Sequence, residues 1–135
     1  MAPHVTILRN LGDNAIMATA VERGFPAEVA LELGCRLGIS QDKLSAIVQI
    51  PKRTLHRRIQ EKEPLKQDES ERVWRLFRLY QRAVDVFENE VRAREWFASH
   101  PRALGGETPL EFAQTEPGAR EVENLLGRIE HGVFG

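Results

Sequence analysis

Residues 40 to 59 read Ser40-Gln-Asp-Lys-Leu44-Ser-Ala-Ile-Val48-Gln-Ile50-Pro-Lys-Arg-Thr54-Leu55-His-Arg-Arg-Ile59. Ser40 is a good N-cap, and apolar residues then recur at spacings of three and four, which predicts a short helix over 41–48. Pro51 begins a second helix at a position that proline tolerates. Two short helices joined by about three residues are typical of a helix-turn-helix motif.

The second helix of this motif separates apolar from polar side chains. Leu55 and Ile59 lie about one turn apart and face the first helix, where Ser45 is small enough to allow a close approach. The opposite face is rich in groups that pair with bases in the major groove, because Arg donates twice to guanine and Gln pairs with adenine. Two flanking cations, Lys52 and Arg58, are suited to phosphates or to acidic neighbours. The candidate DNA-binding residues are Lys52, Arg53, Thr54, His56, Arg57, Arg58 and Gln60.

Charge is concentrated in the same helix. The formal net charge of the chain is -1, so the average charge does not indicate nucleic-acid binding. Between Pro51 and Lys62, however, five positive side chains stand against the single negative one of Glu61. Such local clustering is what a DNA-binding surface needs, since one face of the protein meets the phosphates.

The turn of the motif leaves the DNA interpretation open. Many helix-turn-helix motifs have glycine in the turn, where φ is positive, and this chain has Gln49 there. Glutamine adopts that conformation at a cost of about 1 kcal/mol. The alternative to DNA binding is a solvated basic helix in a bundle with another role.

Helix signals continue on both sides of the motif. Upstream, a helix over 13–23 is capped by Asp13, lined by Ile16, Met17, Ala20 and Val21, and ended by Gly24. A second helix follows Pro26, ends at Gly38, and places Cys35 in the core through an apolar pattern with its neighbouring leucines.

Downstream, residues 68–98 carry the strongest helical periodicity, with a break expected at Asn89. The arginines at 72, 75, 78 and 82 fall on the complementary face, which we expect to be solvated, with contact to DNA or a partner as the alternative. After a loop over 99–107, Thr108 and Glu111 form a capping box, and a last helix covers 117–131. Because no strand pattern appears, we expect an all-α protein.

Several function classes lack their signatures. The four histidines are scattered without metal-ligand spacing, and no P-loop or nucleophile elbow occurs, so neither an enzyme nor a metal or cofactor site is expected. A single cysteine excludes an internal disulfide and favours a reducing cytoplasm. We find neither a signal peptide nor an apolar run long enough for a membrane span.

The stretch from about Gly24 to Gly132 resembles antitoxins of the Xre/MbcA/ParS group, the partners of RES-domain toxins. The similarity is carried by an ordered series of short runs: 37–40, 53–58, Leu65, 69–72, Ala83, 86–87, Trp96, 104–110, Gly118 and 122–132. The resemblance implies an N-terminal Cro/repressor-like helix-turn-helix bundle over 24–66 and a helical toxin-binding domain over 67–135. Residues 1–23 then form an N-terminal arm and helix.

The same resemblance implies the partners. The chain would neutralise a RES-type, NAD-degrading toxin by direct binding and, with that toxin, repress its own operator DNA. We expect a homodimer within a higher-order toxin–antitoxin complex and no bound cofactor. The candidate toxin-binding residues come from the glycine loop and the C-terminal end: Arg102, Gly105, Gly106, Arg128, His131, Val133 and Phe134. An exposed Phe134 would anchor an interface, whereas the alternative is that it folds back onto the core.

Two other functions compete with this interpretation. The first is a stand-alone transcriptional repressor whose C-terminal helices serve only dimerisation. The second is a binding module that has lost DNA binding and keeps only its partner. The presence of a RES-type reading frame beside the gene distinguishes the antitoxin from the stand-alone repressor.

Overall fold

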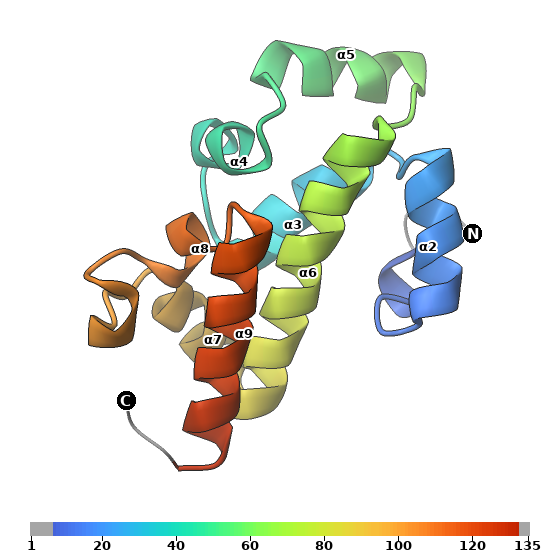
Figure 1. Cartoon of the computed structure of the whole chain (residues 1–135). Helices are drawn as coiled ribbons and strands as arrows, with labels where there is room; N and C mark the ends of the chain where they lie inside the picture. The colour runs from blue at the N-terminus through green and yellow to red at the C-terminus, as the bar shows by residue number, and fades with distance from the viewer. Residues whose placement is uncertain (1–6, 133–135) are drawn as a thin grey trace. The chain divides into compact units, whose positions relative to one another are not determined.

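The computed structural model describes residues 7–132, and the regular structure in that range is helical, without strands. The helices carry the labels of Figure 1. The chain divides into two compact units, Met1–Phe77 and Arg78–Gly135. The boundary falls inside the long helix α6 (Gln67–Phe87). The predicted all-α fold class is confirmed.

The first unit contains the helix-turn-helix motif. Its helices are α2 (Asn14–Arg23), α3 (Glu28–Leu37), α4 (Gln41–Val48), α5 (Lys52–Glu61) and the first part of α6. Helix α4 packs against both α3 and α5. The core of this unit is apolar and includes Met17, Phe25, Val29, Leu33, Leu44, Val48, Ile50, Leu55, Leu65, Val73 and Phe77.

Local signals set the helix ends in this unit. Asp13 Oδ1 accepts a hydrogen bond from the backbone N–H of Ile16 at 3.1 Å. Ser40 Oγ accepts one from Lys43 N–H at 3.1 Å. Gly24 ends α2 at a φ of 92°, a conformation that favours glycine. These caps are confirmed as predicted, because each depends only on residues within one turn.

Two residues predicted to lie in the core are instead exposed. Ile16 is 43% exposed, since α2 buries only Met17 and Val21. Cys35 is also exposed, because α3 turns Leu33 and Leu37 inward and Cys35 lies two residues from each, on the opposite side of the helix. The apolar residues around Cys35 extend around more of the circumference of α3 than the side of the helix that is buried.

The second unit consists of the end of α6 with α7 (Glu90–Phe97), the 3-10 turn η1 (Arg102–Leu104), α8 (Pro109–Phe112) and α9 (Glu116–Glu130). The break predicted at Asn89 is confirmed: Glu88 has a φ of 53°, and Asn89 caps α7 through Arg92 N–H at 2.9 Å. Helix α8 packs against α7 and α9, and α9 also packs against η1. The core is again apolar and includes Tyr80, Phe97, Leu104, Leu110, Val122 and Leu126.

Helix α9 begins in close contact with α8. Thr108 caps α8 through Glu111 N–H at 3.1 Å, which confirms the threonine half of the capping box. A Cβ on Gly118 would lie 1.8 Å from the carbonyl oxygen of Phe112. Glycine at 118 is therefore required for α9 to start where it does.

The arginines of α6 do not form a purely solvated face. Arg72 donates to the backbone of the first unit, whereas Arg78 and Arg82 pair with Glu123 and Glu130 of α9. The prediction of a solvated arginine face is wrong for these three, because neighbouring elements supply acceptors that periodicity does not reveal.

Among residues 7–132, no helix is both long and apolar enough to cross a membrane.

Candidate functional site

The turn between α4 and α5 sets the direction of α5. The Ser45 hydroxyl donates a hydrogen bond to the carbonyl oxygen of Ile50 at 2.7 Å. Gln49 adopts the left-handed conformation with a φ of 58°. The helix-turn-helix turn therefore forms with glutamine in the position where glycine is usual, and Ser45 contributes a bond as well as its small size.

Five of the residues predicted to contact DNA lie on the exposed side of α5. They are Lys52, Arg53, His56, Arg57 and Gln60. Thr54 is half-buried, and Leu55 below them is 2% exposed. Helix α5 thus presents cations and hydrogen-bonding groups to solvent while its apolar side faces the unit's core.

Short contacts hold some of these side chains at the surface. Lys52 Nζ lies 3.0 Å from Asp42 Oδ1, and His56 Nε2 lies 2.8 Å from Gln41 Oε1, so both contact the first turn of α4. Within the described chain, Arg53 makes neither a hydrogen bond nor an ion pair, and its guanidinium is available to a ligand.

Arg57 is bound by two glutamates. Its Nη1 lies 2.8 Å from Glu63 Oε2 and 3.2 Å from Glu61 Oε2. The hydrogen bond to Glu63 raises the pKa of the Arg57 guanidinium, and the charge of Glu63 and the bond to Glu61 add to this. A phosphate reaching Arg57 would meet both carboxylates beside it.

Arg58 does not belong to the DNA-facing set. Its side chain is 5% exposed and pairs with Glu69 of α6, whose side chain is 10% exposed. The assignment of Arg58 to DNA contact is wrong, and the acidic neighbour is the partner observed. Its position, three residues after Leu55, places it on the inward side of α5.

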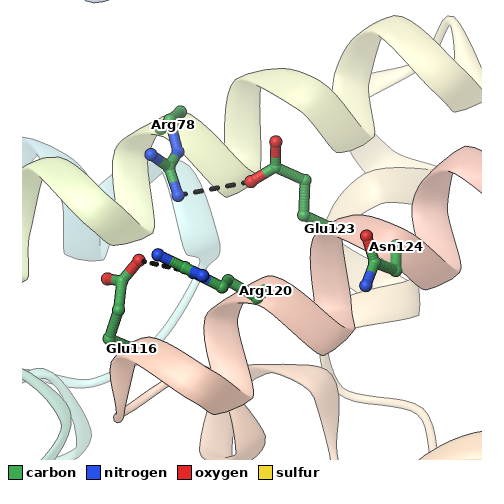
Figure 2. A pocket seen from close by; sticks show the side chains of 5 residues that line it. All are labelled: Arg78, Glu116, Arg120, Glu123 and Asn124. Carbon is green, nitrogen blue, oxygen red and sulfur yellow. Dashed lines mark ion pairs between the residues drawn. The ribbon is translucent and has the colours of Figure 1, made fainter.

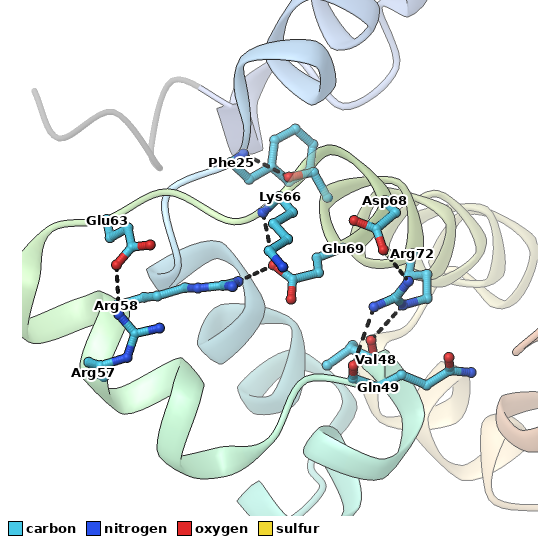
Figure 3. Close-up of polar contacts among 11 residues, drawn as sticks. Phe25, Val48, Gln49, Arg57, Arg58, Glu63, Lys66, Asp68, Glu69 and Arg72 are labelled. Carbon is cyan, nitrogen blue, oxygen red and sulfur yellow. Dashed lines mark hydrogen bonds and ion pairs between the residues drawn. The ribbon is translucent and has the colours of Figure 1, made fainter.

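Sequence reasoning missed two residues of α6 that contact the motif, Glu69 and Arg72 (Figure 3). Glu69 accepts from Arg58 and, at 2.8 Å, from the backbone N–H of Lys66. Arg72 donates to the carbonyl oxygens of Val48 at 2.7 Å and Gln49 at 3.3 Å. The spacing of Glu69 from Lys66 matches a capping box, but no sequence signal links either residue to α5.

The glycine loop of the second unit lies at the surface. Arg102, Gly105 and Gly106 are exposed, and the two glycines have φ values of 66° and 88°. A Cβ on either glycine would meet nothing within 4 Å. His100 Nδ1 lies 2.8 Å from the carbonyl oxygen of Gly106 and holds the loop. The glycines are therefore required by backbone conformation and leave open space above the loop.

The end of α9 carries the other candidate toxin-binding residues. His131 is exposed, whereas Arg128 is half-buried, and its Nε has no hydrogen-bond partner among the described residues. Arg82 forms two bonds to Glu130, of 2.7 and 2.9 Å, which lower the pKa of the Glu130 carboxyl. Val133 and Phe134 lie outside the described residues.

A pocket of about 470 Å³ opens in the second unit (Figure 2). Its lining is polar throughout: Arg78, Glu116, Arg120, Glu123 and Asn124. Arg78 pairs with Glu123 at 3.2 Å and Arg120 with Glu116 at 3.5 Å. This lining differs from the mostly apolar walls of small-molecule sites.

Residues 7–132 contain no group of three or more potential protein ligands able to hold a metal ion.

Comparison with known families divides the chain into two matched regions. Residues 17–78 match the family described as the antitoxin Xre-like helix-turn-helix domain. Residues 82–132 match the family described as the antitoxin Xre/MbcA/ParS C-terminal toxin-binding domain. The first match covers most of the first compact unit, and the second covers most of the second.

Individual relatives are similar over most of the chain. A protein named Antitoxin Xre from Yersinia enterocolitica is 32% identical over 88% of this chain and 81% of its own length. Another protein of that name, from Photorhabdus laumondii, is 34% identical over 89% of this chain and 79% of its own length. A Sphingobium protein named Prs ADP-ribosylating antitoxin is 26% identical over 84% of this chain and 77% of its own length.

Proposed function

The chain belongs to the Xre antitoxin family, and on this premise we propose that it neutralises a RES-type toxin and represses its own operon. One observation carries the proposal: an exposed cationic helix and a match to a toxin-binding domain occur in separate units of one chain. DNA binding and toxin binding are accordingly assigned to different residues. A substitution in one set should therefore weaken one activity and leave the other unchanged.

We assign operator binding to the exposed face of α5, with Arg53, Arg57 and Gln60 reading bases and Lys52 reaching phosphates. Exposure of these side chains supports the assignment, as does the turn between α4 and α5, which forms with Gln49 in the left-handed conformation. Recognition helices of this motif lie in the major groove, and two-fold operators are read by dimers. We therefore propose a homodimer on DNA, within a larger complex when the toxin is present.

We assign toxin binding to Arg102, Gly105 and Gly106 of the loop and to Arg128 and His131 at the end of α9. Exposure of the loop and of His131 supports the assignment. Val133 and Phe134 complete the proposed contact. Deleting residues 132–135 should impair neutralisation without lowering the melting temperature, and full rescue of toxin-expressing cells by the truncated chain would refute this contact.

The reaction of the toxin has two candidate outcomes. The family resemblance favours degradation of cellular NAD. The name of the Sphingobium relative instead indicates ADP-ribosylation, in which NAD donates ADP-ribose to a protein and nicotinamide leaves. Of the two reactions, only ADP-ribosylation leaves ADP-ribose attached to a protein.

The test is co-expression of the full chain with the protein encoded by the adjacent reading frame, which we propose is the RES-type toxin. We expect the toxin alone to lower NAD and stop growth, and the chain to restore both by forming a complex of defined mass on size exclusion. An anti-ADP-ribose blot separates the two reactions. Failure to bind any neighbouring gene product, together with intact promoter binding, would instead support a stand-alone repressor.

A further inference from the structure

The first turns of α6 hold α5 at two separate points (Figure 3). One point is the turn before α5, which Arg72 contacts. The other is Arg58, the seventh of the ten residues of α5, which Glu69 contacts. We refer to Arg72 with the Arg58–Glu69 pair as the α6 brace. None of its three side chains lies among the exposed residues of the DNA-facing side.

Arg72 satisfies the end of α4. Its Nε donates to the carbonyl oxygen of Val48, the last residue of α4, and its Nη2 donates to Gln49 in the strained turn. Asp68, one turn earlier on α6, lies 3.3 Å from Arg72 Nη1 and orients the guanidinium. A cation at a helix C-terminus satisfies otherwise open carbonyl groups and interacts favourably with the helix dipole. The turn that aims α5 is thereby fixed to α6.

The Arg58–Glu69 pair is poorly suited to adding stability. Both charges are removed from water, and Arg58 Nε is buried without a hydrogen-bond partner among the described residues. Desolvation of such a pair offsets much of its attraction, so apolar side chains would serve stability as well. The pair does, however, fix how α5 lies against the start of α6, because Glu69 must also accept a hydrogen bond from the backbone N–H of Lys66 at 2.8 Å.

We propose that the α6 brace consists of positioning residues for DNA sequence recognition. This inference rests on the proposed operator binding. Base contacts require donors placed within a fraction of an ångström, whereas phosphate contacts tolerate small rotations of a helix. Loss of the brace therefore removes discrimination between sequences and leaves general affinity for DNA.

The experiment compares two DNA fragments with the full chain: the promoter of its own operon and a shuffled sequence of equal length. The test variant is Arg72→Met, which keeps the aliphatic stem. The matched control is Arg36→Met, since Arg36 on α3 forms a single surface pair with Glu32 at 3.0 Å. Affinity is measured by anisotropy over a range of salt concentrations, with thermal melts on the same samples.

We expect Arg72→Met to weaken promoter binding at least about tenfold, to change shuffled-DNA binding by less than about twofold, and to leave the salt slope unchanged. Arg72→Lys should restore part of the discrimination, and Arg36→Met should bind as the unsubstituted chain does. Equal loss on both fragments, with a salt slope smaller by about one, would make Arg72 a phosphate contact and overturn the proposal. Unchanged discrimination would overturn it as well.

A second variant keeps the test decisive if Arg72→Met unfolds. The double substitution Arg58→Met with Glu69→Gln removes the ion pair, leaves no buried charge unpaired and keeps an acceptor for Lys66 N–H. We expect it to remain folded and to lose discrimination; retained discrimination would overturn the proposal. If the unsubstituted chain does not distinguish the two fragments, it is the proposed operator binding that fails.

Discussion

Arg58 of α5 and Glu69 of α6 form an ion pair with only 5% and 10% of their side chains exposed. The preceding residue, Arg57, is exposed and pairs with Glu63 at the surface. Adjacent arginines in one helix therefore have different roles: one joins two helices, and the other faces solvent. The difference follows from their positions, about 100° apart around the helix axis.

This contrast predicts effects of very different size for two equivalent substitutions. Arg58→Met should destabilise the fold by about 3 kcal/mol, because it leaves the Glu69 carboxylate buried without its cation. Arg57→Met should change stability by less than about 0.5 kcal/mol, since exposed pairs contribute little. Urea unfolding followed by circular dichroism measures both. Equal stability of the two variants would contradict the burial of Arg58.

The glutamates around Arg57 are expected to oppose DNA binding. Glu63→Gln removes a negative charge 2.8 Å from the Arg57 guanidinium and should strengthen binding to any DNA, by roughly threefold at low salt. The gain should disappear at high salt, where surface charges are screened. Glu121→Gln makes the same charge change at an exposed position of α9 and serves as the control. A gain of equal size in both variants would show an effect of net charge alone.

Two glycines of α9 offer a paired test of packing. Gly118→Ala would place a Cβ 1.8 Å from the Phe112 carbonyl oxygen and should destabilise the second unit by about 1–3 kcal/mol. A Cβ on Gly127 meets nothing within 4 Å, so Gly127→Ala should stabilise α9 by about 1 kcal/mol through helix propensity. Thermal melts of the two variants check this, and a stabilising Gly118→Ala would refute the close approach of α8.

The Arg82–Glu130 pair predicts a pH dependence. The hydrogen bonds from Arg82 lower the pKa of Glu130, so the folded chain binds this proton less readily than the unfolded chain does. A lowered carboxyl pKa adds stability above the unfolded value, and the contribution is lost as the pH falls through the folded value. The unsubstituted chain should therefore melt above Glu130→Gln at pH 7, and the difference should begin to shrink as the pH falls below about 4 and vanish in stronger acid. A difference that persists in acid would exclude the pair as its cause.

Features that depend on neighbouring residues were predictable from the sequence. The caps at Asp13, Ser40 and Thr108 and the break at Asn89 each involve contacts within one turn, and the structure confirms them. The inward side of α5 at Leu55 also follows from periodicity, which is a local property.

Features that depend on distant residues were not predictable in this way. The inward position of Arg58 follows from its spacing to Leu55, but its partner Glu69 lies eleven residues later on another helix, and no spacing rule predicts that pairing. Cys35 sits in an apolar run, yet its exposure depends on which side of α3 meets α4. Arg72 reaches across 24 residues to Val48, and no spacing rule connects the two.

We propose that the exposed side of α5 binds DNA independently of toxin binding. The most direct test of this proposal is anisotropy of a labelled promoter fragment with the Arg53→Ala/Arg57→Ala double variant. The control is Arg36→Ala/Arg92→Ala, and complex formation with the product of the adjacent reading frame is measured on the same preparations. We expect the first variant to lose at least about 2 kcal/mol of DNA affinity, with partner binding unchanged and the control unaffected. Undiminished promoter affinity, or an equal loss in the control, would show that the exposed side of α5 does not recognise the promoter.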